Sequence, residues 1–172
     1  GVHFIDSYLN YSNILIKINN YTKALSILDK LLLLDQKNLN ALRQRAYIYK
    51  NFSEYKKAEE DLSLSIKIED SNFLNNKSIV ELYIDTKEYQ KAIPYCEKMI
   101  KKNVEKQFFL HKKILSKIYL GDWICLKDDL EIFNNNLDFN NISLDPYALK
   151  YLNDDPDLQK KFSENYWEQK PK

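Results

Sequence analysis

The side chains best suited to catalytic or metal chemistry are scattered along this sequence. His3, His111, Cys96 and Cys125 are its only histidines and cysteines, and they lie far apart in the 172-residue chain. A metal site or an acid–base pair requires several such groups to converge, and this spacing matches no metal or disulfide framework. We therefore predict no catalytic residue and no metal site, with both histidines as surface or groove residues.

The sequence also lacks the glycines that a phosphate-binding loop requires. Loops that cradle phosphates are rich in glycine, and the chain contains only Gly1 and Gly121. No cofactor is expected, and the sequence predicts that this chain is not itself an enzyme.

The two thiols are expected to have different surroundings. Cys96 falls where a helix packs on its partner, so we predict a small buried apolar side chain in preference to a nucleophile. Cys125 is predicted to lie in the first turn of a helix, where a reactive thiol is easier to place. Two unpaired cysteines fit a reducing compartment, and the predicted location is cytoplasmic.

Charge and composition argue against two classes of partner. The 26 basic and 25 acidic side chains leave a formal charge of +1, so we expect no nucleic-acid and no membrane partner. The longest apolar run, Leu31 to Leu34, is far shorter than the roughly 20 residues of a membrane span. The 13 tyrosines could stack on bases, but we expect most of them in the core. The many asparagines are interpreted as coding bias.

A regular sequence repeat sets out the elements that must carry any site. Its aromatic residues are Tyr21, Tyr55, Tyr89 and Trp123, which are evenly spaced. Each of the first three is followed, at the third position after it, by an alanine, and these are Ala24, Ala58 and Ala92; the fourth copy has Leu126 instead. Two antiparallel helices with short turns account for a period of about 34 residues.

Apolar residues spaced three and four apart agree with helices throughout. In the first helix of each pair they are Tyr8, Tyr11 and Leu15, then Leu42, Ala46 and Tyr49, then Ile79 and Tyr83. In the second helices they are Leu28 and Leu31, then Leu62 and Ile66, then Cys96, Met99 and Ile100. No segment alternates with period two, so the predicted fold class is all-α.

These strings resemble the tetratricopeptide repeat family. The predicted repeats span 5–38, 39–72, 73–106 and 107–140, and the resemblance implies an α-solenoid, a right-handed superhelix of helix-turn-helix pairs. Gly121 stands where the family often has glycine, whereas the family's proline near each repeat's end is absent. Lys113 and Lys117 occupy positions where apolar residues are expected, so the fourth repeat is predicted to be shifted in register or to serve as an atypical last unit.

The resemblance also implies a binding groove on the concave side of the first helices. The candidate groove residues are Asn10, Asn13, Arg43, Tyr47, Lys50, Lys77, Glu81 and His111. Arg43, Lys50 and Lys77 would make its middle positive, which suits an acidic side chain or a peptide's C-terminal carboxylate. The alternatives are a solvated face or a groove filled by the tail.

The tail, 141–172, is predicted to be a linker followed by capping helices. Asp145-Pro146 and Asp155-Pro156 have the form of helix starts, an acidic cap followed by proline. We expect a short helix from Pro146 and a longer one from Pro156 to about Trp167, whose apolar side chains would cover the last repeat.

The same tail is similar to the repeat-to-catalytic junction of O-linked N-acetylglucosamine transferase-like (SPINDLY-type) proteins. The similarity rests on Asp122-Trp123, on Pro146-Tyr147-Ala148-Leu149 and on the run 154–159, Asp-Asp-Pro-Asp-Leu-Gln. It implies a catalytic domain beyond Lys172. Animal members line their groove with asparagines, and the corresponding residues are Asn10, Gln44, Ser78 and Lys112, so only the first is kept.

Two functions remain open from the sequence. The first is a non-catalytic scaffold that holds protein or peptide segments in the groove. The alternative is the acceptor-presenting region of a glycosyltransferase. Self-association through the groove or the end repeats is a third, weaker expectation.

Overall fold

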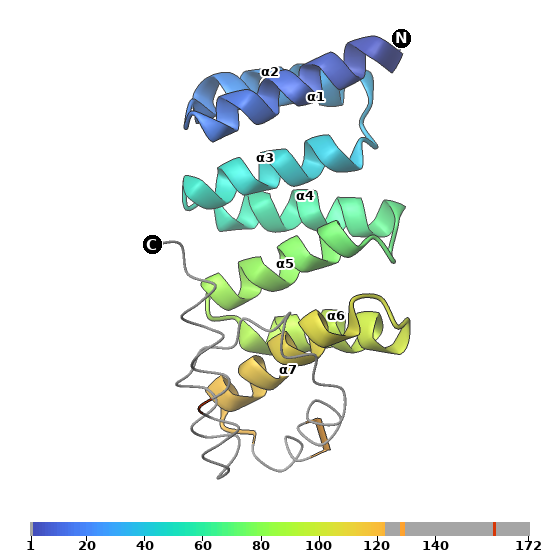
Figure 1. Ribbon diagram of the computed structural model, residues 1–172. Coiled ribbons are helices and arrows are strands. Elements are labelled where there is room, and N and C mark those ends of the chain that lie inside the picture. The colour runs from blue at the N-terminus through green and yellow to red at the C-terminus, as the bar shows by residue number, and fades with distance from the viewer. Residues whose placement is uncertain (1, 123–127, 130–159, 161–172) are drawn as a thin grey trace. The chain divides into compact units, whose positions relative to one another are not determined.

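All secondary structure in the described residues is α-helical. The computed structural model describes residues 2–122, 128, 129 and 160 (Figure 1). Its helices are α1 (Val2–Lys17), α2 (Tyr21–Leu34), α3 (Leu39–Asn51), α4 (Tyr55–Ile68), α5 (Phe73–Asp85), α6 (Tyr89–Lys101) and α7 (Lys106–Leu120). The predicted all-α fold class is confirmed.

The chain divides into two compact units. The first, Gly1–Tyr95, contains α1 to α5 and the beginning of α6, and the second, Cys96–Lys172, contains the rest of α6 and α7. Within the first unit each helix from α1 to α5 contacts the next one. In addition, α1 contacts α3 and α3 contacts α5. These three odd-numbered helices therefore make one continuous side of the first unit.

The turn inside each helix pair has the same conformation in every copy. The residue two positions before each aromatic of the series has a left-handed backbone, and these are Asn19 (φ 58°), Ser53 (φ 60°), Lys87 (φ 61°) and Gly121 (φ 70°). Only glycine adopts this conformation without the cost of about 1 kcal/mol that a Cβ adds. The period of the sequence thus extends through the turn after α7.

Asparagine side chains cap three helices. The side-chain oxygen of Asn38 accepts a hydrogen bond from the Ala41 amide (3.0 Å), and Asn72, one repeat further on, does the same for the Asn75 amide (3.1 Å). Asn20 caps α2 in a longer contact with the Lys23 amide (3.4 Å). Because these bonds satisfy free helix amides, the interpretation of asparagine as mere coding bias is wrong at these positions.

The core of the first unit follows the predicted apolar pattern. The main cluster is Leu15, Ala24, Leu28, Leu31, Leu32, Ala41, Leu42 and Ile48, which joins α1, α2 and α3. The three alanines of the repeat are completely buried. Since alanine has the shortest apolar side chain, it lets the two helices of a pair approach closely.

The prediction that most tyrosines lie in the core holds only in part for the described residues. Tyr83 is buried, and five tyrosines are half-buried, of which Tyr8 and Tyr21 pack against the core cluster. The exposed ones are Tyr11, Tyr47, Tyr55 and Tyr119. Tyr11 was expected to pack in the core of the first pair, but it lies on the outer side of α1. Ser12, the next residue along, is the buried one.

A buried ion pair connects three helices in the first unit. The Arg45 guanidinium on α3 donates two hydrogen bonds to Asp61 on α4 (2.8 and 2.7 Å) and one to Asp29 on α2 (2.8 Å). These carboxylates raise the pKa of Arg45 against the opposing effect of burial. Asp61 is almost fully buried, whereas Asp29 is about half exposed.

The same arrangement recurs two repeats further on, in the second unit. Lys113 contacts Glu97 (3.2 Å) and Asp129 (3.0 Å), the equivalents of Asp29 and Asp61. Lys117 makes a second buried contact with Asp129 (2.6 Å). The two lysines therefore keep the register of the repeat and are accommodated by carboxylates, so of the two alternatives predicted for the fourth repeat, α7 does not support the shift in register.

Several predictions concern residues outside the described part of the chain. They include Trp123 and Cys125, the capping helices from Pro146 and Pro156, and the transferase-like segments of the tail. None of the described helices combines the length and the hydropathy that spanning a bilayer requires.

Removing the Asp61 carboxylate should destabilise the first unit strongly. Asp61→Ala leaves the Arg45 guanidinium without its main partner, and we expect the free energy of unfolding to fall by about 2–4 kcal/mol. The matched change Asp29→Ala should cost under about 1 kcal/mol because this carboxylate is solvent-screened. Urea unfolding followed by circular dichroism measures the stability of both variants. Equal losses of stability would contradict the greater contribution assigned to Asp61.

Candidate functional site

A cavity of about 380 Å³ opens among the odd-numbered helices of the first unit. Its lining residues are Asn13 and Ile16 of α1, Arg43, Gln44, Ala46, Tyr47 and Lys50 of α3, Ala58 and Leu62 of α4, and Ser78, Glu81 and Leu82 of α5. Cavities of this size accommodate small ligands or a few side chains of a peptide. It is the candidate binding site, and we call it the groove cavity.

Five of the eight predicted groove residues line this cavity. They are Asn13, Arg43, Tyr47, Lys50 and Glu81. Lys77 is one helical turn before Glu81 on α5, and its ammonium lies 3.9 Å from the Glu81 carboxylate. Asn10 is exposed on α1 but is not part of the lining. His111 belongs to α7 in the second unit and is not part of the lining either.

Arg43 is the distinctive charge of the groove cavity. Its guanidinium donates to the side-chain oxygens of Asn40 (2.8 Å) and Asn75 (3.4 Å), and no described carboxylate pairs with it. Burial lowers its pKa from the ordinary value, although arginine still remains charged at any physiological pH. A half-buried cation held by neutral amides keeps unused capacity for an anion.

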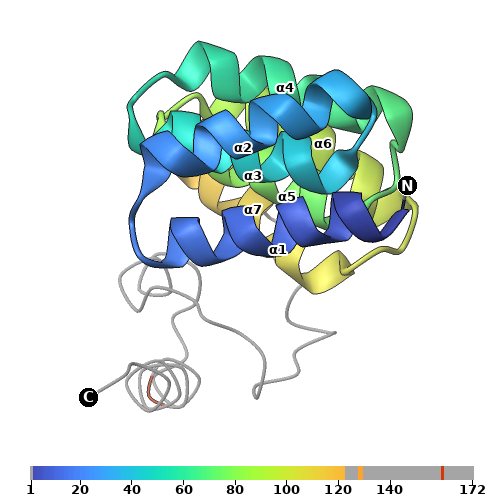
Figure 2. The same cartoon turned by 90° about the horizontal axis from the view of Figure 1, so that it is seen from above.

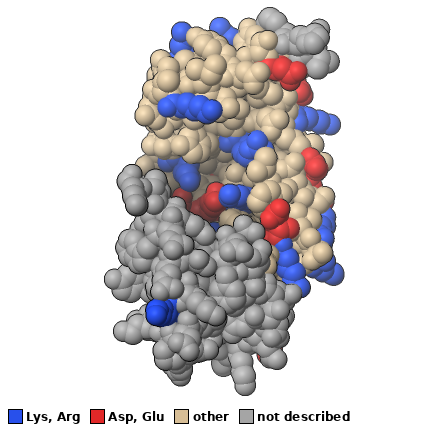
Figure 3. Space-filling view, viewed as in Figure 1, with Lys and Arg blue, Asp and Glu red and all other residues tan. Residues whose placement is uncertain are grey.

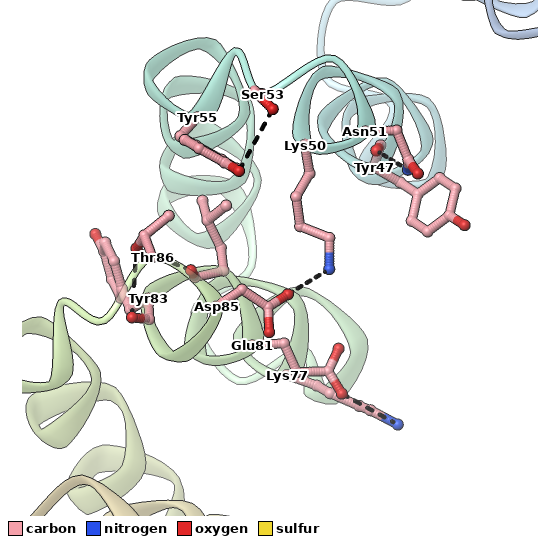
Figure 4. A network of polar contacts seen from close by, with 11 residues as sticks. Tyr47, Lys50, Asn51, Ser53, Tyr55, Lys77, Glu81, Tyr83, Asp85 and Thr86 are labelled. Atoms are coloured by element: carbon pink, nitrogen blue, oxygen red, sulfur yellow. Dashed lines mark hydrogen bonds and ion pairs between the residues drawn. The ribbon is translucent and has the colours of Figure 1, made fainter. Parts of the chain in front are cut away.

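The other cations of the groove have acidic partners. Lys50 on α3 reaches Asp85 on α5 (2.8 Å), and Lys77 lies against Glu81, as Figure 4 shows. The three predicted cations therefore face two carboxylates, which leaves a formal charge of +1. The prediction of a positive middle is wrong for Lys50 and Lys77 and holds only at Arg43.

The face of the molecule in Figure 3 agrees with this balance. Basic and acidic side chains lie beside one another there, with wide uncharged areas between them. A general electrostatic attraction for polyanions has no source among the described residues of this face. Recognition in the groove therefore depends on individual contacts.

The remaining walls of the groove cavity are apolar or weakly polar. Tyr47 is 46% exposed and meets Tyr21 edge to face at 6.4 Å. Gln44 accepts a 2.6 Å hydrogen bond from Ser12, which ties α3 to α1 beside the cavity. Ala58 and Leu62 were missed by the sequence prediction, because the family resemblance placed the groove on the first helix of each pair, and both residues belong to the second. The repeat alanine could have indicated them in the sequence, because its small side chain leaves α4 accessible from the cavity.

Cys96 and His111 are poorly disposed for thiol or acid–base chemistry. Cys96 is fully buried, and burial raises the pKa of its thiol to about 12, as expected for a packed apolar residue. Burial, with a smaller contribution from Lys112, lowers the pKa of His111 to about 3. The described residues include no cluster of three or more potential metal ligands.

The tetratricopeptide repeat family matches residues 5–38 of the chain. No curated protein sequence matches this chain significantly. The family match covers the first helix pair, in which α1 and α2 carry the first copy of the aromatic–alanine series.

Solved structures share the fold over nearly the whole chain. YrrB, described as a tetratricopeptide-repeat protein with an unusual peptide-binding site, is 17% identical with a TM-score of 0.66, covering 92% of this chain and 77% of its own. PilF of Pseudomonas aeruginosa is 15% identical with a TM-score of 0.76, covering 98% of this chain and 77% of its own. MamA of Desulfovibrio magneticus RS-1 is 14% identical with a TM-score of 0.68, covering 95% of this chain and 88% of its own. Identities this low show the fold alone, and that fold is the tetratricopeptide-repeat α-solenoid.

The His111 environment should make the folded protein sensitive to mild acid. The pKa is about 3 in the folded state against 6.5 ordinarily, so the unfolded chain takes up the proton first as the pH falls below 6.5. We expect the unfolding free energy to fall by about 1–2 kcal/mol from this residue between pH 7 and pH 5. His111→Gln should remove that loss in urea unfolding at the two pH values. An unchanged pH dependence in the variant would contradict the burial of this imidazole.

Proposed function

We propose that this chain is a protein-interaction scaffold whose groove cavity holds a peptide segment through a carboxylate. The fold supports the scaffold function, because stacked helix pairs present extended concave surfaces to partners. YrrB, which shares this fold, is described as having a peptide-binding site. The single observation that carries the proposal is Arg43, a half-buried guanidinium on the cavity wall with no carboxylate partner among the described residues.

The contacts around Arg43 favour an acidic side chain or a C-terminal carboxylate as the anchor. Guanidinium groups bind carboxylates through paired, charge-assisted hydrogen bonds. A neutral side chain would leave the charge of Arg43 unused, and an amine would be repelled. Asn40 and Asn75 already hold the guanidinium in place, so less side-chain freedom is lost when a ligand binds.

The rest of the cavity suits an apolar residue next to that anchor. Ile16 and Leu82 come from α1 and α5, on either side of α3, and Tyr47 adds an aromatic ring. A peptide side chain placed among them would remove apolar surface from water. Lys50 and Glu81 then supply one group of each sign for the peptide backbone or flanking residues. The proposed ligand is an extended segment with an acidic residue, or its own C-terminus, beside an apolar residue.

We also propose that the chain acts without catalysis. A thiol whose pKa is raised to about 12 is not a nucleophile at neutral pH, and an imidazole whose pKa is near 3 is a poor general base there. The free, buried Cys96 is compatible with a reducing compartment, and a cytoplasmic location is part of this proposal.

The tail motifs favour a second function, the acceptor-presenting arm of a glycosyltransferase. Asp122-Trp123, Pro146 to Leu149 and 154–159 follow one another as in the junction of those enzymes. In this case the peptide held by the groove would be the acceptor protein. The test is the native reading frame after Lys172. A nucleotide-sugar-binding domain there would support the arm, and a stop codon would contradict it.

Arg43→Gln should weaken peptide binding without unfolding the chain. The probe is a peptide with a free C-terminus, selected from a random library for binding to the full chain. Its affinity is measured by titration calorimetry. We expect at least a tenfold loss of affinity, because a charge-assisted hydrogen bond contributes about 1.5–3 kcal/mol. Glutamine keeps an amide that can bond to Asn40 and Asn75.

The matched control is Lys56→Gln, which removes an exposed charge on α4 outside the cavity lining. It should leave the affinity unchanged. Selected peptides without any carboxylate near the apolar residue, or equal affinities for wild type and Arg43→Gln, would refute the proposed anchor.

A further inference from the structure

Three aromatic side chains meet at one edge of the groove cavity. Tyr47 of α3 lines the cavity, and the centre of its ring lies 6.4 Å from that of Tyr21, the first residue of α2. The ring of Phe52, directly after α3, lies 6.0 Å from the same Tyr21 ring. Figure 2 shows the start of α2 and the end of α3 at the same end of the first unit. We call these three residues the aromatic corner.

The aromatic corner is open to solvent. Tyr47 is 46% exposed and Phe52 40%, while Tyr21 is half-buried. The Tyr21 ring makes angles of 65° with Tyr47 and 90° with Phe52, so both contacts are edge to face. In such a contact only one of the two rings uses its face. The corner therefore presents ring faces as well as ring edges to a ligand.

The fold does not require this concentration of aromatic rings. One repeat further on, the equivalents of Tyr21, Tyr47 and Phe52 are Tyr55, Glu81 and Thr86. The backbone is the same in both copies, with φ −85° and ψ 4° at Phe52 against φ −85° and ψ 1° at Thr86. Only the tyrosine that begins the second helix belongs to the repeat. The other two rings add apolar surface that continues the groove cavity, which points to contact with the same ligand.

The charges beside the aromatic corner favour an uncharged ligand group. Aromatic rings can bind ammonium groups, but Tyr47 lies one helical turn after Arg43, whose guanidinium has no carboxylate partner among the described residues. Lys50, on the other side of Tyr47 along α3, is neutralised by Asp85. A ligand cation would therefore be repelled by Arg43, whereas an apolar group would not.

The hydrogen bonds of the corner favour proline among the apolar groups. The side-chain oxygen of Asn19 already accepts from the Tyr21 hydroxyl (2.9 Å), and the Tyr47 carbonyl accepts from the Asn51 side-chain amide (2.8 Å). Proline has no N–H that needs an acceptor, and its ring packs flat on aromatic faces. Proline also holds a peptide extended before it binds, so less freedom is lost. Aromatic-lined grooves recognise proline-containing segments in this way.

Helix geometry sets the distance between this proline and the carboxylate. Arg43 and Tyr47 are one turn apart on α3, a rise of about 6 Å along the axis. Both side chains tilt toward the start of the helix, so the same offset applies to their outer ends. An extended peptide advances about 3.3 Å per residue. The two contacts are therefore two peptide residues apart.

From these observations we propose that the aromatic corner binds a proline of the peptide, two residues from the carboxylate held by Arg43. The proposal rests on the groove function proposed above and specifies its ligand further. The residue between the two anchors is the apolar one that lies among Ile16, Tyr47 and Leu82. The ligand motif is then proline, an apolar residue and a residue with a carboxylate.

The probe is the acetylated peptide Ala-Ala-Pro-Leu-Ala with a free C-terminus, titrated into the full chain and followed by NMR. Matched peptides have alanine, phenylalanine or trimethyl-lysine in place of proline. A further peptide has its proline moved to the first position, and another has an amidated C-terminus. We expect the proline peptide to bind about threefold or more tightly than the alanine peptide, as for other aromatic contacts. Moving the proline should remove this advantage.

Variants separate the aromatic corner from the carboxylate anchor. Phe52→Thr introduces the residue of the next repeat, which has the same backbone conformation, and circular dichroism verifies that the variant folds. It should remove the preference for proline and leave the alanine peptide unaffected, because Phe52 is not part of the cavity lining. Arg43→Gln should weaken both peptides by the same factor. The control Tyr11→Thr, which changes an exposed tyrosine outside the cavity lining, should alter neither affinity.

The outcomes distinguish failure here from failure of the groove function. Equal binding of the amidated peptide, or no binding of any peptide, would overturn the carboxylate anchor and this proposal with it. Binding that needs the carboxylate but shows no preference for proline would overturn this proposal alone. So would a preference that persists in Phe52→Thr, or tighter binding of the phenylalanine or trimethyl-lysine peptide, because the corner would then have another occupant.

Discussion

Close contact between the two helices of each pair is the constraint on which the rest of this structure depends. It is possible because Ala24, Ala58 and Ala92 are completely buried between the helices, where a longer side chain would force them apart. The left-handed residue in each intervening turn sets the return direction of the chain. With these two features present in the first three pairs, the odd-numbered helices of the first unit align and the groove cavity opens between them. Ala58 itself forms part of its wall.

Contacts between successive repeats use two kinds of chemistry. The Asp29–Arg45–Asp61 cluster and its counterpart two repeats later, Glu97–Lys113–Asp129, each pair one cation with a nearly buried carboxylate and with a half-exposed one. The repeat between them has Ser63, Ile79 and Tyr95 at the equivalent positions, and Ile79 is completely buried. A buried charge is tolerated only when it is paired and hydrogen-bonded. The charged clusters therefore pair particular residues, while in the repeat between them packing of Ile79 is combined with a hydrogen bond from Tyr83 to Glu59 (2.8 Å).

The surface proposed for binding follows from this organisation. The groove cavity lies where odd-numbered helices meet, so it combines short apolar walls with polar groups from three helices, and Arg43 is the cation left without a carboxylate among the described residues.

Most features that repeat in the sequence were predictable from it. The aromatic–alanine series indicated the helix pairs. The resemblance to the repeat family suggested eight groove residues, of which Asn13, Arg43, Tyr47, Lys50 and Glu81 line the cavity, while Asn10, Lys77 and His111 do not. The capping asparagines were also visible, since Asn38 and Asn72 occupy the same position in successive repeats, but composition alone concealed their role. The repeat boundaries, the capping helices of the tail and the transferase-like junction stay predictions.

The sequence by itself determined the all-α class, because helical periodicity can be read within one segment. Only the tertiary structure decided which charges remain available. Lys50 is neutralised by Asp85 on another helix, and Lys113 and Lys117 are accommodated by Asp129, while Arg43 meets only amides among the described residues. It also decided that Tyr11 is exposed, since a residue on the stacking side is buried only when another helix covers it. Charge pairing and burial depend on distances between residues far apart in the chain, and those distances arise only when the repeats stack.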